Sequence, residues 1–148
     1  MYEFLDYRAC DVMTSAPITV GETTSLAEAE AIFAAHAFNT LPVVGPAHEL
    51  LGVVSKLDLL KAFRFTGRAL FPPYEQIMAR PVADVMTRDV ETVTPRMPLT
   101  RVLERLVALR TKCLPVLVGR ELVGVIARED VLRGLQRALA GERATGPI

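Results

Sequence analysis

The stretch that decides the fold is Asp11-Val12-Met13-Thr14, which recurs 73 positions later as Asp84-Val85-Met86-Thr87. The same offset relates Leu41-Pro42-Val43 to Leu114-Pro115-Val116. Further matches at offsets of 73 and then 72 are Thr19-Val20 with Thr92-Val93, Leu26 with Leu99, Glu49-Leu50 with Glu121-Leu122, Gly52-Val53 with Gly124-Val125, Asp58 with Asp130, and Leu60 with Leu132. Because order and spacing persist, the chain is predicted to be a duplication. Each copy is small, so we expect the two copies to share one core.

The first copy predicts the element order strand, helix, strand, strand, helix. Ser25 lies three residues before Glu28, which is the spacing of a capping box, so a helix is expected to begin there and to run to about His36. The other predicted elements are a short strand at Ile18-Thr19-Val20, a strand at Leu41–Val44, a turn at Gly45-Pro46, a strand at Leu50–Ser55 and a closing helix from about Leu57 to Phe63.

The second copy predicts the same order. Pro98 suits the first position of a helix, where its missing N–H is harmless. An apolar stripe at helical spacing follows, made of Leu99, Val102, Leu103, Leu106 and Leu109. The remaining elements are strands at 114–118 and 122–127, a turn at Gly119-Arg120, and a helix from about Glu129 to Leu139 that Gly141 is expected to stop.

Composition narrows the class of protein. The chain has 148 residues, of which 51% are hydrophobic and 23% charged. This balance is typical of a folded globule and excludes extensive disorder. No run approaches the ~20 apolar residues of a membrane helix, and the N-terminus carries acids where a secretion signal carries lysines. We therefore expect a cytoplasmic protein with no membrane partner. Its 2 cysteines make neither a disulfide framework nor a zinc site.

The charge is balanced overall and uneven along the chain. There are 17 basic and 17 acidic residues, which argues against general nucleic-acid binding. Residues 1–63 hold 3 basic and 8 acidic residues, whereas residues 64–148 hold 14 and 9. Two oppositely charged halves could attract each other, within the chain or between chains. The other interpretation is that they are solvated surfaces of different composition.

The segment between the copies, residues 64–83, is apolar and aromatic. It contains Phe65, Leu70, Phe71, Pro72, Pro73, Tyr74, Ile77 and Met78. It is therefore no flexible Gly/Ser linker, and we expect it to pack on the body or on a partner chain. Lining the mouth of a ligand cleft is the alternative.

These motifs resemble the tandem CBS domain pair, or Bateman module, of the cystathionine β-synthase domain family. Besides the Asp-Val-Met-Thr and Leu-Pro-Val segments, the resemblance is carried by Gly52–Asp58 and Gly124–Asp130. It implies an α+β fold, in which two β-α-β-β-α repeats pack through their sheets about a pseudo-twofold axis. The expected parts are a first repeat at 1–63 with its core at 11–63, the linker at 64–83, a second repeat at 84–140 and a loose tail at 141–148.

The resemblance also implies a regulatory module without catalytic residues. Many relatives bind AMP, ADP, ATP or S-adenosylmethionine in clefts between the repeats. Such a ligand needs no cofactor beside it, and the output lies in an unknown partner protein. Many relatives also form disc-like homodimers. The alternatives are a ligand-independent dimerisation or scaffold module with degenerate clefts, and, more remotely, an enzyme or a nucleic-acid binder.

The resemblance assigns ribose binding to Asp58 and Asp130, because a carboxylate can accept from both hydroxyls of a cis-diol. A hydroxyl three residues earlier commonly contacts phosphate at the start of a helix. The first repeat has Ser55 there, whereas the second has Ala127, a departure from the pattern. The Asp58 site is therefore complete by this test. Ser55-x-x-Asp58 also spells a plain helix capping box, which is the competing interpretation.

The remaining expected ligand contacts surround these aspartates. Adenine is expected against Ile18, Thr19, Leu41 and Val43 at one site, and against Glu91, Thr92, Leu114 and Val116 at the other, partly through backbone bonds. Lys56 and Arg128 are the candidate phosphate cations. Relatives carry a His-Arg pair before Leu-Pro, where this chain has Asn39-Thr40 and Lys112-Cys113, so only Lys112 keeps a charge. This favours a monophosphate or a nucleoside-like ligand over a triphosphate.

The other polar residues predict less. His36 and His48 lack an acidic partner at metal spacing, so no metal site is expected. Cys113 precedes a core strand and is expected to be a buried thiol. Arg101, Arg105 and Arg110 are expected on the solvated side of the second long helix, with a docking surface as the alternative.

Overall fold

The computed structural model describes residues 2–64 and 73–143, and its contacts divide the chain into two compact units. We call residues 18–90 the Asp58 unit, and residues 1–17 together with 91–148 the Asp130 unit. The units differ from the sequence repeats, because the first 17 residues pack with the second repeat. The repeat boundaries at 1–63 and 84–140 remain a prediction about the sequence. Each packed unit contains residues from both predicted repeats.

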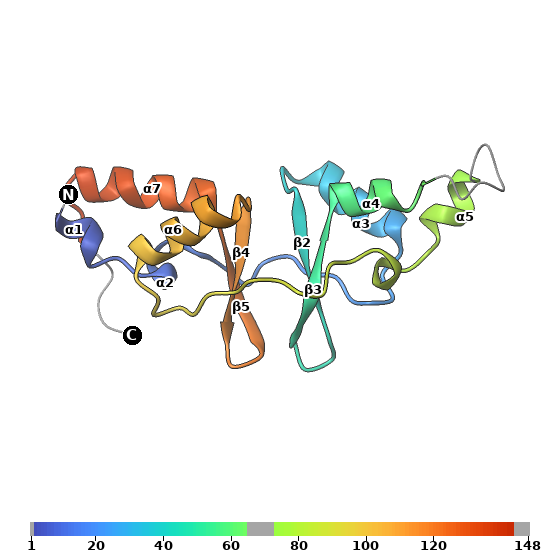
Figure 1. Ribbon diagram of the computed structural model, residues 1–148, viewed down its shortest axis with the longest axis horizontal. Helices are drawn as coiled ribbons and strands as arrows, with labels where there is room; N and C mark the ends of the chain where they lie inside the picture. Colours follow the sequence, from blue (N-terminus) through green and yellow to red (C-terminus); the bar gives the residue numbers. More distant parts are fainter. Residues whose placement is uncertain (1, 65–72, 144–148) are drawn as a thin grey trace. The chain divides into compact units, whose positions relative to one another are not determined.

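The Asp58 unit is built on an antiparallel hairpin. Its elements are α3 (Leu26–Ala35), β2 (Thr40–Val44), β3 (Leu50–Ser55), α4 (Lys56–Lys61), α5 (Tyr74–Met78) and the 3-10 helix η1 (Val82–Asp84). Strands β2 and β3 pair with Leu41 opposite Val54, and α3 and α4 lie on one side of them (Figure 1). The strand expected at 18–20 is reduced to a single parallel bridge between Val20 and Val43.

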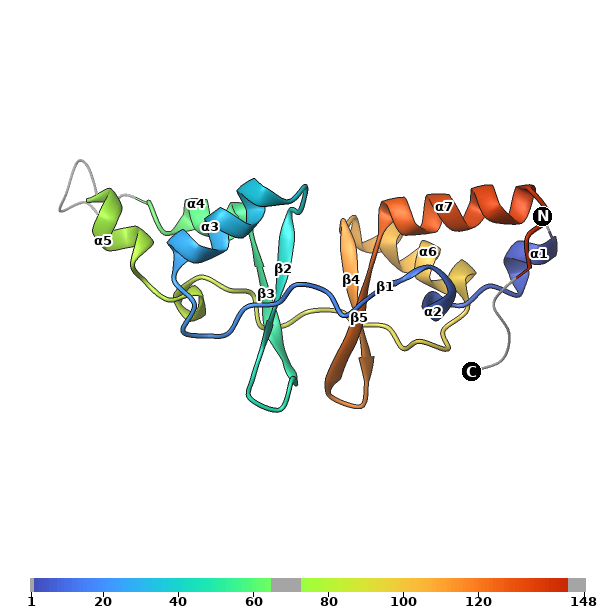
Figure 2. The ribbon, with the colours of Figure 1, turned by 180° about the vertical axis from the view of Figure 1, so that it is seen from behind.

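The Asp130 unit repeats this plan with additional helices. Its elements are α1 (Tyr2–Leu5), α2 (Ala9–Val12), β1 (Thr14–Ser15), α6 (Leu99–Leu109), β4 (Cys113–Val118), β5 (Glu121–Ala127) and α7 (Arg128–Leu139). The strand order is β1-β5-β4, all antiparallel, and Val93 bridges Val116 as Val20 bridges Val43. Helix α1 lies beside the C-terminal end of α7 (Figure 2). Helices α1 and α2 have no counterpart among the elements that the sequence predicts.

Two glycines allow the repeated Asp-Val-Met-Thr segments to pack closely against a strand. Thr87 pairs with Val53 through two backbone bonds of 2.8 Å, and a Cβ on the adjacent Gly52 would lie 2.3 Å from the Thr87 carbonyl oxygen. Thr14 lies opposite Val125 in the antiparallel β1–β5 pair, and a Cβ on Gly124 would lie 2.9 Å from the Thr14 carbonyl oxygen. Each glycine therefore admits the Asp-Val-Met-Thr segment of the other sequence repeat.

The expected single core is instead two clusters. One combines α3, the β2–β3 hairpin and the described part of the linker, with Leu26, Leu41 and Val54 at its centre. The other combines α1, α2, α6, α7 and the β4–β5 hairpin around Tyr7 and Leu99. Each cluster draws on both sequence repeats, because the paired Asp-Val-Met-Thr segments bring residues across. The packed units are also closer in charge than the two halves of the sequence. The Asp58 unit has 6 basic and 8 acidic residues, and the Asp130 unit has 11 and 9.

Most predicted helix ends are confirmed. Ser25 caps α3 by accepting from the Glu28 N–H at 3.1 Å, and Pro98 precedes α6. Gly141, with φ of +82°, follows the last turn of α7 in a left-handed conformation that favours glycine. The predicted apolar stripe of α6 is one residue too long, because Leu109, the last residue of the helix, is 45% exposed.

The described part of the linker packs on its own unit. Ile77 and Met78 of α5 are buried in the core of the Asp58 unit. Tyr74 is exposed, stacks on Phe63 and donates to the Glu30 carboxylate, which raises the pKa of the Tyr74 phenol. Packing on the body is therefore confirmed for 73–83, whereas Phe65, Leu70, Phe71 and Pro72 lie outside the described residues, as do tail residues 144–148.

Across residues 2–64 and 73–143, none of the helices has both the length and the apolar character that a membrane span requires.

Candidate functional site

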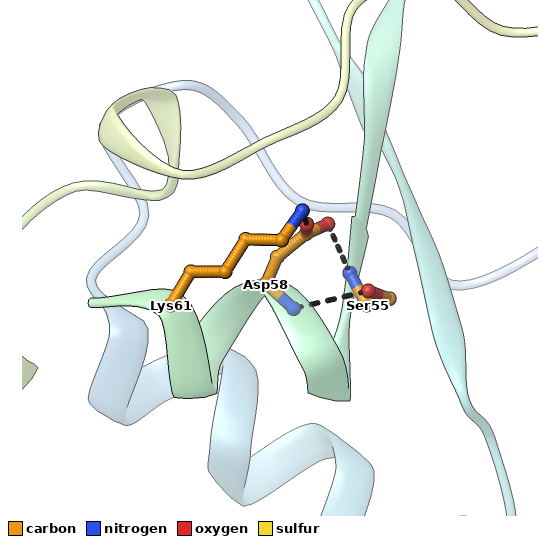
Figure 3. Close-up of polar contacts among 3 residues, drawn as sticks. All are labelled: Ser55, Asp58 and Lys61. Carbon is orange, nitrogen blue, oxygen red and sulfur yellow. Dashed lines mark hydrogen bonds and ion pairs between the residues drawn. The ribbon is translucent and has the colours of Figure 1, made fainter. Parts of the chain in front are cut away.

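The junction of β3 and α4 forms a complete capping box around Asp58. The Ser55 N–H donates to Asp58 Oδ2 at 2.9 Å, and the Asp58 N–H donates to Ser55 Oγ at 3.1 Å (Figure 3). This bond to the hydroxyl uses one lone pair of Ser55 and leaves its O–H able to donate. The structural role expected of Ser55-x-x-Asp58 is therefore confirmed, and it is compatible with ligand binding.

A third contact completes the surroundings of Asp58. The Lys61 ammonium donates to Asp58 Oδ1 at 3.1 Å, as Figure 3 shows. The Asp58 side chain is only 3% exposed, whereas that of Lys61 is 44% exposed. Each carboxylate oxygen thus accepts one bond from the protein. Because an ionised carboxylate offers about four lone-pair positions, one position on each oxygen remains for a diol.

The Asp130 unit keeps the backbone part of this arrangement and loses the hydroxyl. The Ala127 N–H donates to Asp130 Oδ2 at 2.7 Å, and Arg133 donates to Asp130 Oδ1. Ala127 offers no side-chain acceptor to the first turn of α7. The Asp130 side chain is 6% exposed. The two aspartates therefore accept the same backbone bond, and they differ in the side chains beside them, Ser55 and Lys61 in one unit and Ala127 and Arg133 in the other.

The two junctions also tie the start of the closing helix to the residue before the Leu-Pro strand. The Lys56 N–H donates to the Asn39 carbonyl and the Arg128 N–H donates to the Lys112 carbonyl, both at 3.2 Å. The side chains differ. Lys56 is exposed, whereas the Arg128 guanidinium donates to the Arg110 and Thr111 carbonyls at the end of α6. Arg128 is thus engaged by its own unit.

The predicted adenine positions lie side by side within each unit. The Val20 N–H donates to the Pro42 carbonyl at 3.0 Å, and the Val93 N–H donates to the Pro115 carbonyl at 3.0 Å. The side chains of the flanking strand positions are fully or almost fully buried in the two cores, so they can offer a ligand only their backbone; these are Leu41, Val43, Leu114 and Val116.

The preceding segments are more accessible. Ile18 is 39% exposed and Thr19 is half-buried. Glu91 is exposed, and the Thr92 carbonyl accepts from Arg105 at 2.9 Å. Arg105 therefore holds the segment before Val93 in place.

Of the three arginines expected on the solvated side of this helix, Arg101 and Arg110, which directly follows α6, are exposed, whereas Arg105 is half-buried against the Thr92 carbonyl.

Candidate metal and nucleophile sites are not supported by the described residues. Within 2–64 and 73–143 no group of His, Cys, Asp and Glu side chains could hold a metal ion. His36 is exposed and stacks on Phe38, and His48 is half-buried. Burial and the nearby Asp11 carboxylate raise the pKa of the Cys10 thiol, which disfavours its reactive thiolate. Cys113 is half-buried, so the expectation of a buried thiol there was wrong.

Sequence reasoning missed Lys61 and Arg133, the basic side chains on the two carboxylates. Both lie three residues after their aspartate, and they occupy matching positions of the two repeats. Because residues three apart are neighbours on a helix surface, the repeated charge one turn after each aspartate was the signal that could have found them.

Two α+β units, each with a buried aspartate at its strand-to-helix junction, define a tandem-repeat module. Residues 9–64 and 82–137 each match the CBS domain, so the chain belongs to the CBS domain family. A solved structure of CBSX2 in complex with AMP is similar to this chain, with 26% identity and a TM-score of 0.77. The alignment covers 90% of this chain and 98% of the CBSX2 chain. The CBS domain pair of protein MJ0100, in complex with 5′-methylthioadenosine and S-adenosyl-L-methionine, is 26% identical with a TM-score of 0.69, covering 91% and 97%.

Curated relatives carry similar modules as parts of longer proteins. The A-adding tRNA nucleotidyltransferase of Geobacter sulfurreducens is 30% identical over 125 residues, which is 84% of this chain and 13% of that enzyme. Across the curated relatives the chain spans between 13% and 25% of their length. The similarity therefore concerns the CBS module and not the catalytic remainder of those enzymes.

Proposed function

We propose that this chain is a regulatory module that binds an adenosine-containing ligand at the Asp58 site and transmits its presence to a partner protein. The observation that carries the proposal is the Asp58 carboxylate, buried beside the Ser55 hydroxyl and held by one protein donor on each oxygen. The remaining lone pairs suit the two hydroxyls of a ribose. The Ser55 O–H can donate to a phosphate or another anionic group. The AMP, methylthioadenosine and S-adenosylmethionine complexes of similar modules support this ligand class.

The charges around the site favour a ligand with few negative charges. Lys56 is exposed at the start of α4, whereas Asn39 and Thr40, at the start of β2, supply no cation. Helix α4 has only six residues, so its dipole contributes little. AMP or an S-adenosylmethionine-like ligand therefore fits this site better than ATP.

Regulation requires the ligand to bind one state of the module better than another. No catalytic residue is proposed for this chain, so the change in state is read by a partner protein in the cytoplasm or by a fused domain.

Thermal unfolding with a ligand panel tests this proposal. AMP, ADP, ATP, S-adenosylmethionine, 5′-methylthioadenosine and GMP are compared on wild type, Asp58→Ala and Asp130→Ala. At ~100 times its dissociation constant a ligand adds about 2.7 kcal/mol. This amount raises the melting temperature of a domain of this size by about 5–10 °C.

The expected result is a rise with adenosine compounds that disappears in Asp58→Ala and persists in Asp130→Ala. Absence of a shift with every compound contradicts the proposal.

A ligand-independent dimerisation module is the second candidate, and one observation favours it. Leu60 of α4 and Leu132 of α7 occupy matching repeat positions and are 67% and 57% exposed. Exposed leucines at equivalent positions suit a homodimer formed with a second copy. Sedimentation of wild type, Leu60→Arg and Leu132→Arg tests this function. A dimer that dissociates in these variants supports it, and a monomeric wild type excludes it.

A further inference from the structure

The cations on the two buried carboxylates differ between the units in a way that bears on ligand access. Lys61 and Arg133 lie at matching repeat positions, and each donates to the Oδ1 atom of its aspartate. Both basic side chains are well exposed, at 44% and 60%, whereas the Asp58 and Asp130 side chains are 3% and 6% exposed. Little of either carboxylate is open to solvent, so a ribose that bonds to it competes with the groups already around it, the basic side chain among them.

Only one of the two donors on Asp58 can move cheaply. The Ser55 N–H belongs to the backbone at the end of β3, where Ser55 pairs with Thr40. The Lys61 ammonium is carried by a flexible four-carbon stem that is already half in water, so it can turn away from the carboxylate into solvent without moving the backbone. Lys61 is consequently the group that yields when a diol approaches.

We propose that Lys61 and Arg133 act as gating counter-ions, which compete with the ligand's ribose hydroxyls for the carboxylates of Asp58 and Asp130. The inference rests on the proposed function and adds to it the residues that set affinity at each site. Lysine presents a single point charge, whereas arginine presents a planar fork with several donors that holds a carboxylate more firmly. The gate thus opens at Asp58 and stays closed at Asp130, the unit that also lacks the serine hydroxyl.

The test uses adenosine and 5′-methylthioadenosine, because these ligands carry a ribose and no phosphate. Their dissociation constants are measured by titration calorimetry on wild type, Lys61→Met, Lys61→Arg and the control Arg120→Met, an exposed residue in the β4–β5 turn. Lys61→Met is expected to bind about two- to fivefold more tightly, and Lys61→Arg more weakly than wild type. Arg120→Met is expected to match wild type.

Salt provides a readout that a merely structural lysine would not move. Binding of a neutral nucleoside has no ligand charge to screen. If Lys61 competes for the carboxylate, rising salt weakens the ion pair and tightens nucleoside binding to wild type. This salt dependence is expected to vanish in Lys61→Met. Lys61→Gln repeats the measurement if the methionine variant unfolds at lower temperature.

The outcomes separate the gate from the proposed function. Nucleoside binding to wild type that Lys61→Met leaves equal or weaker, with no salt dependence in either, overturns the gate and leaves the proposed function standing. Absence of binding by any adenosine compound to every variant overturns both. Tighter, salt-independent binding in Lys61→Met supports the gate.

Discussion

The strand-to-helix junctions of the two units share a backbone and differ in their side chains. Ser55 and Ala127 donate their N–H groups to equivalent carboxylate oxygens, at 2.9 and 2.7 Å. Lys56 and Arg128 donate theirs to equivalent carbonyls at the same distance of 3.2 Å. The hydroxyl, by contrast, exists only in the Asp58 unit. The comparison teaches that the aspartate holds the strand-to-helix junction in the same way in both units, whereas the groups around it differ and can set the function of each site.

The largest expected effect comes from the glycines that admit the exchanged segments. In Gly52→Ala the new Cβ would lie 2.3 Å from the Thr87 carbonyl oxygen, whereas in Gly124→Ala the Thr14 carbonyl oxygen would lie farther away, at 2.9 Å, and the Met13 sulfur at 2.8 Å can shift. Gly52→Ala is therefore expected to cost about 3 kcal/mol and Gly124→Ala about 1 kcal/mol of unfolding free energy. Urea unfolding of both variants measures the difference. Equal losses of unfolding free energy in the two variants would contradict this prediction.

Exchanging the capping residues tests the comparison directly. Ser55→Ala removes the acceptor for the Asp58 N–H, so it is expected to destabilise by about 1 kcal/mol. Ala127→Ser supplies that acceptor to α7 and is expected to stabilise by up to about 1 kcal/mol. Thermal unfolding without ligand gives both values. Destabilisation by Ala127→Ser would mean that the two junctions are less alike than their backbone bonds indicate.

The smallest effect concerns Cys10, which occupies the position of Ala83 in the other repeat. Burial raises the pKa of the Cys10 thiol. The neutral thiol therefore favours the folded state, and this contribution is complete below the ordinary thiol pKa and is lost as pH rises through the raised pKa. Wild type is expected to lose slightly more stability than Cys10→Ala between neutral and alkaline pH. Parallel stability curves for the two proteins would contradict this expectation.

Much of the fold was predictable, because its signals are local. Ser25 and Pro98 mark helix starts, and the Gly119-Arg120 turn separates β4 from β5. The exchange of segments was not predictable from one sequence. Thr14 and Thr87 lie in identical motifs, and Gly52 and Gly124 occupy matching positions of the two repeats, so pattern alone cannot assign the partners.

The candidate site was predictable in part. Ser55 and Asp58 follow from the motif, and the structure brings them together. The full burial of the Leu41 and Val43 side chains was not predictable, because a core strand and a ligand contact both favour apolar residues. Lys61 was missed because its partner lies one helical turn away, outside the motif.

Titration calorimetry with AMP on wild type, Asp58→Ala and Asp130→Ala tests the central claim most directly, since it gives stoichiometry as well as affinity. The account predicts one strong site per chain, lost in Asp58→Ala and retained in Asp130→Ala with an unchanged dissociation constant. A strong site that survives Asp58→Ala, or disappears in Asp130→Ala alone, would contradict the assignment of binding to the Asp58 unit.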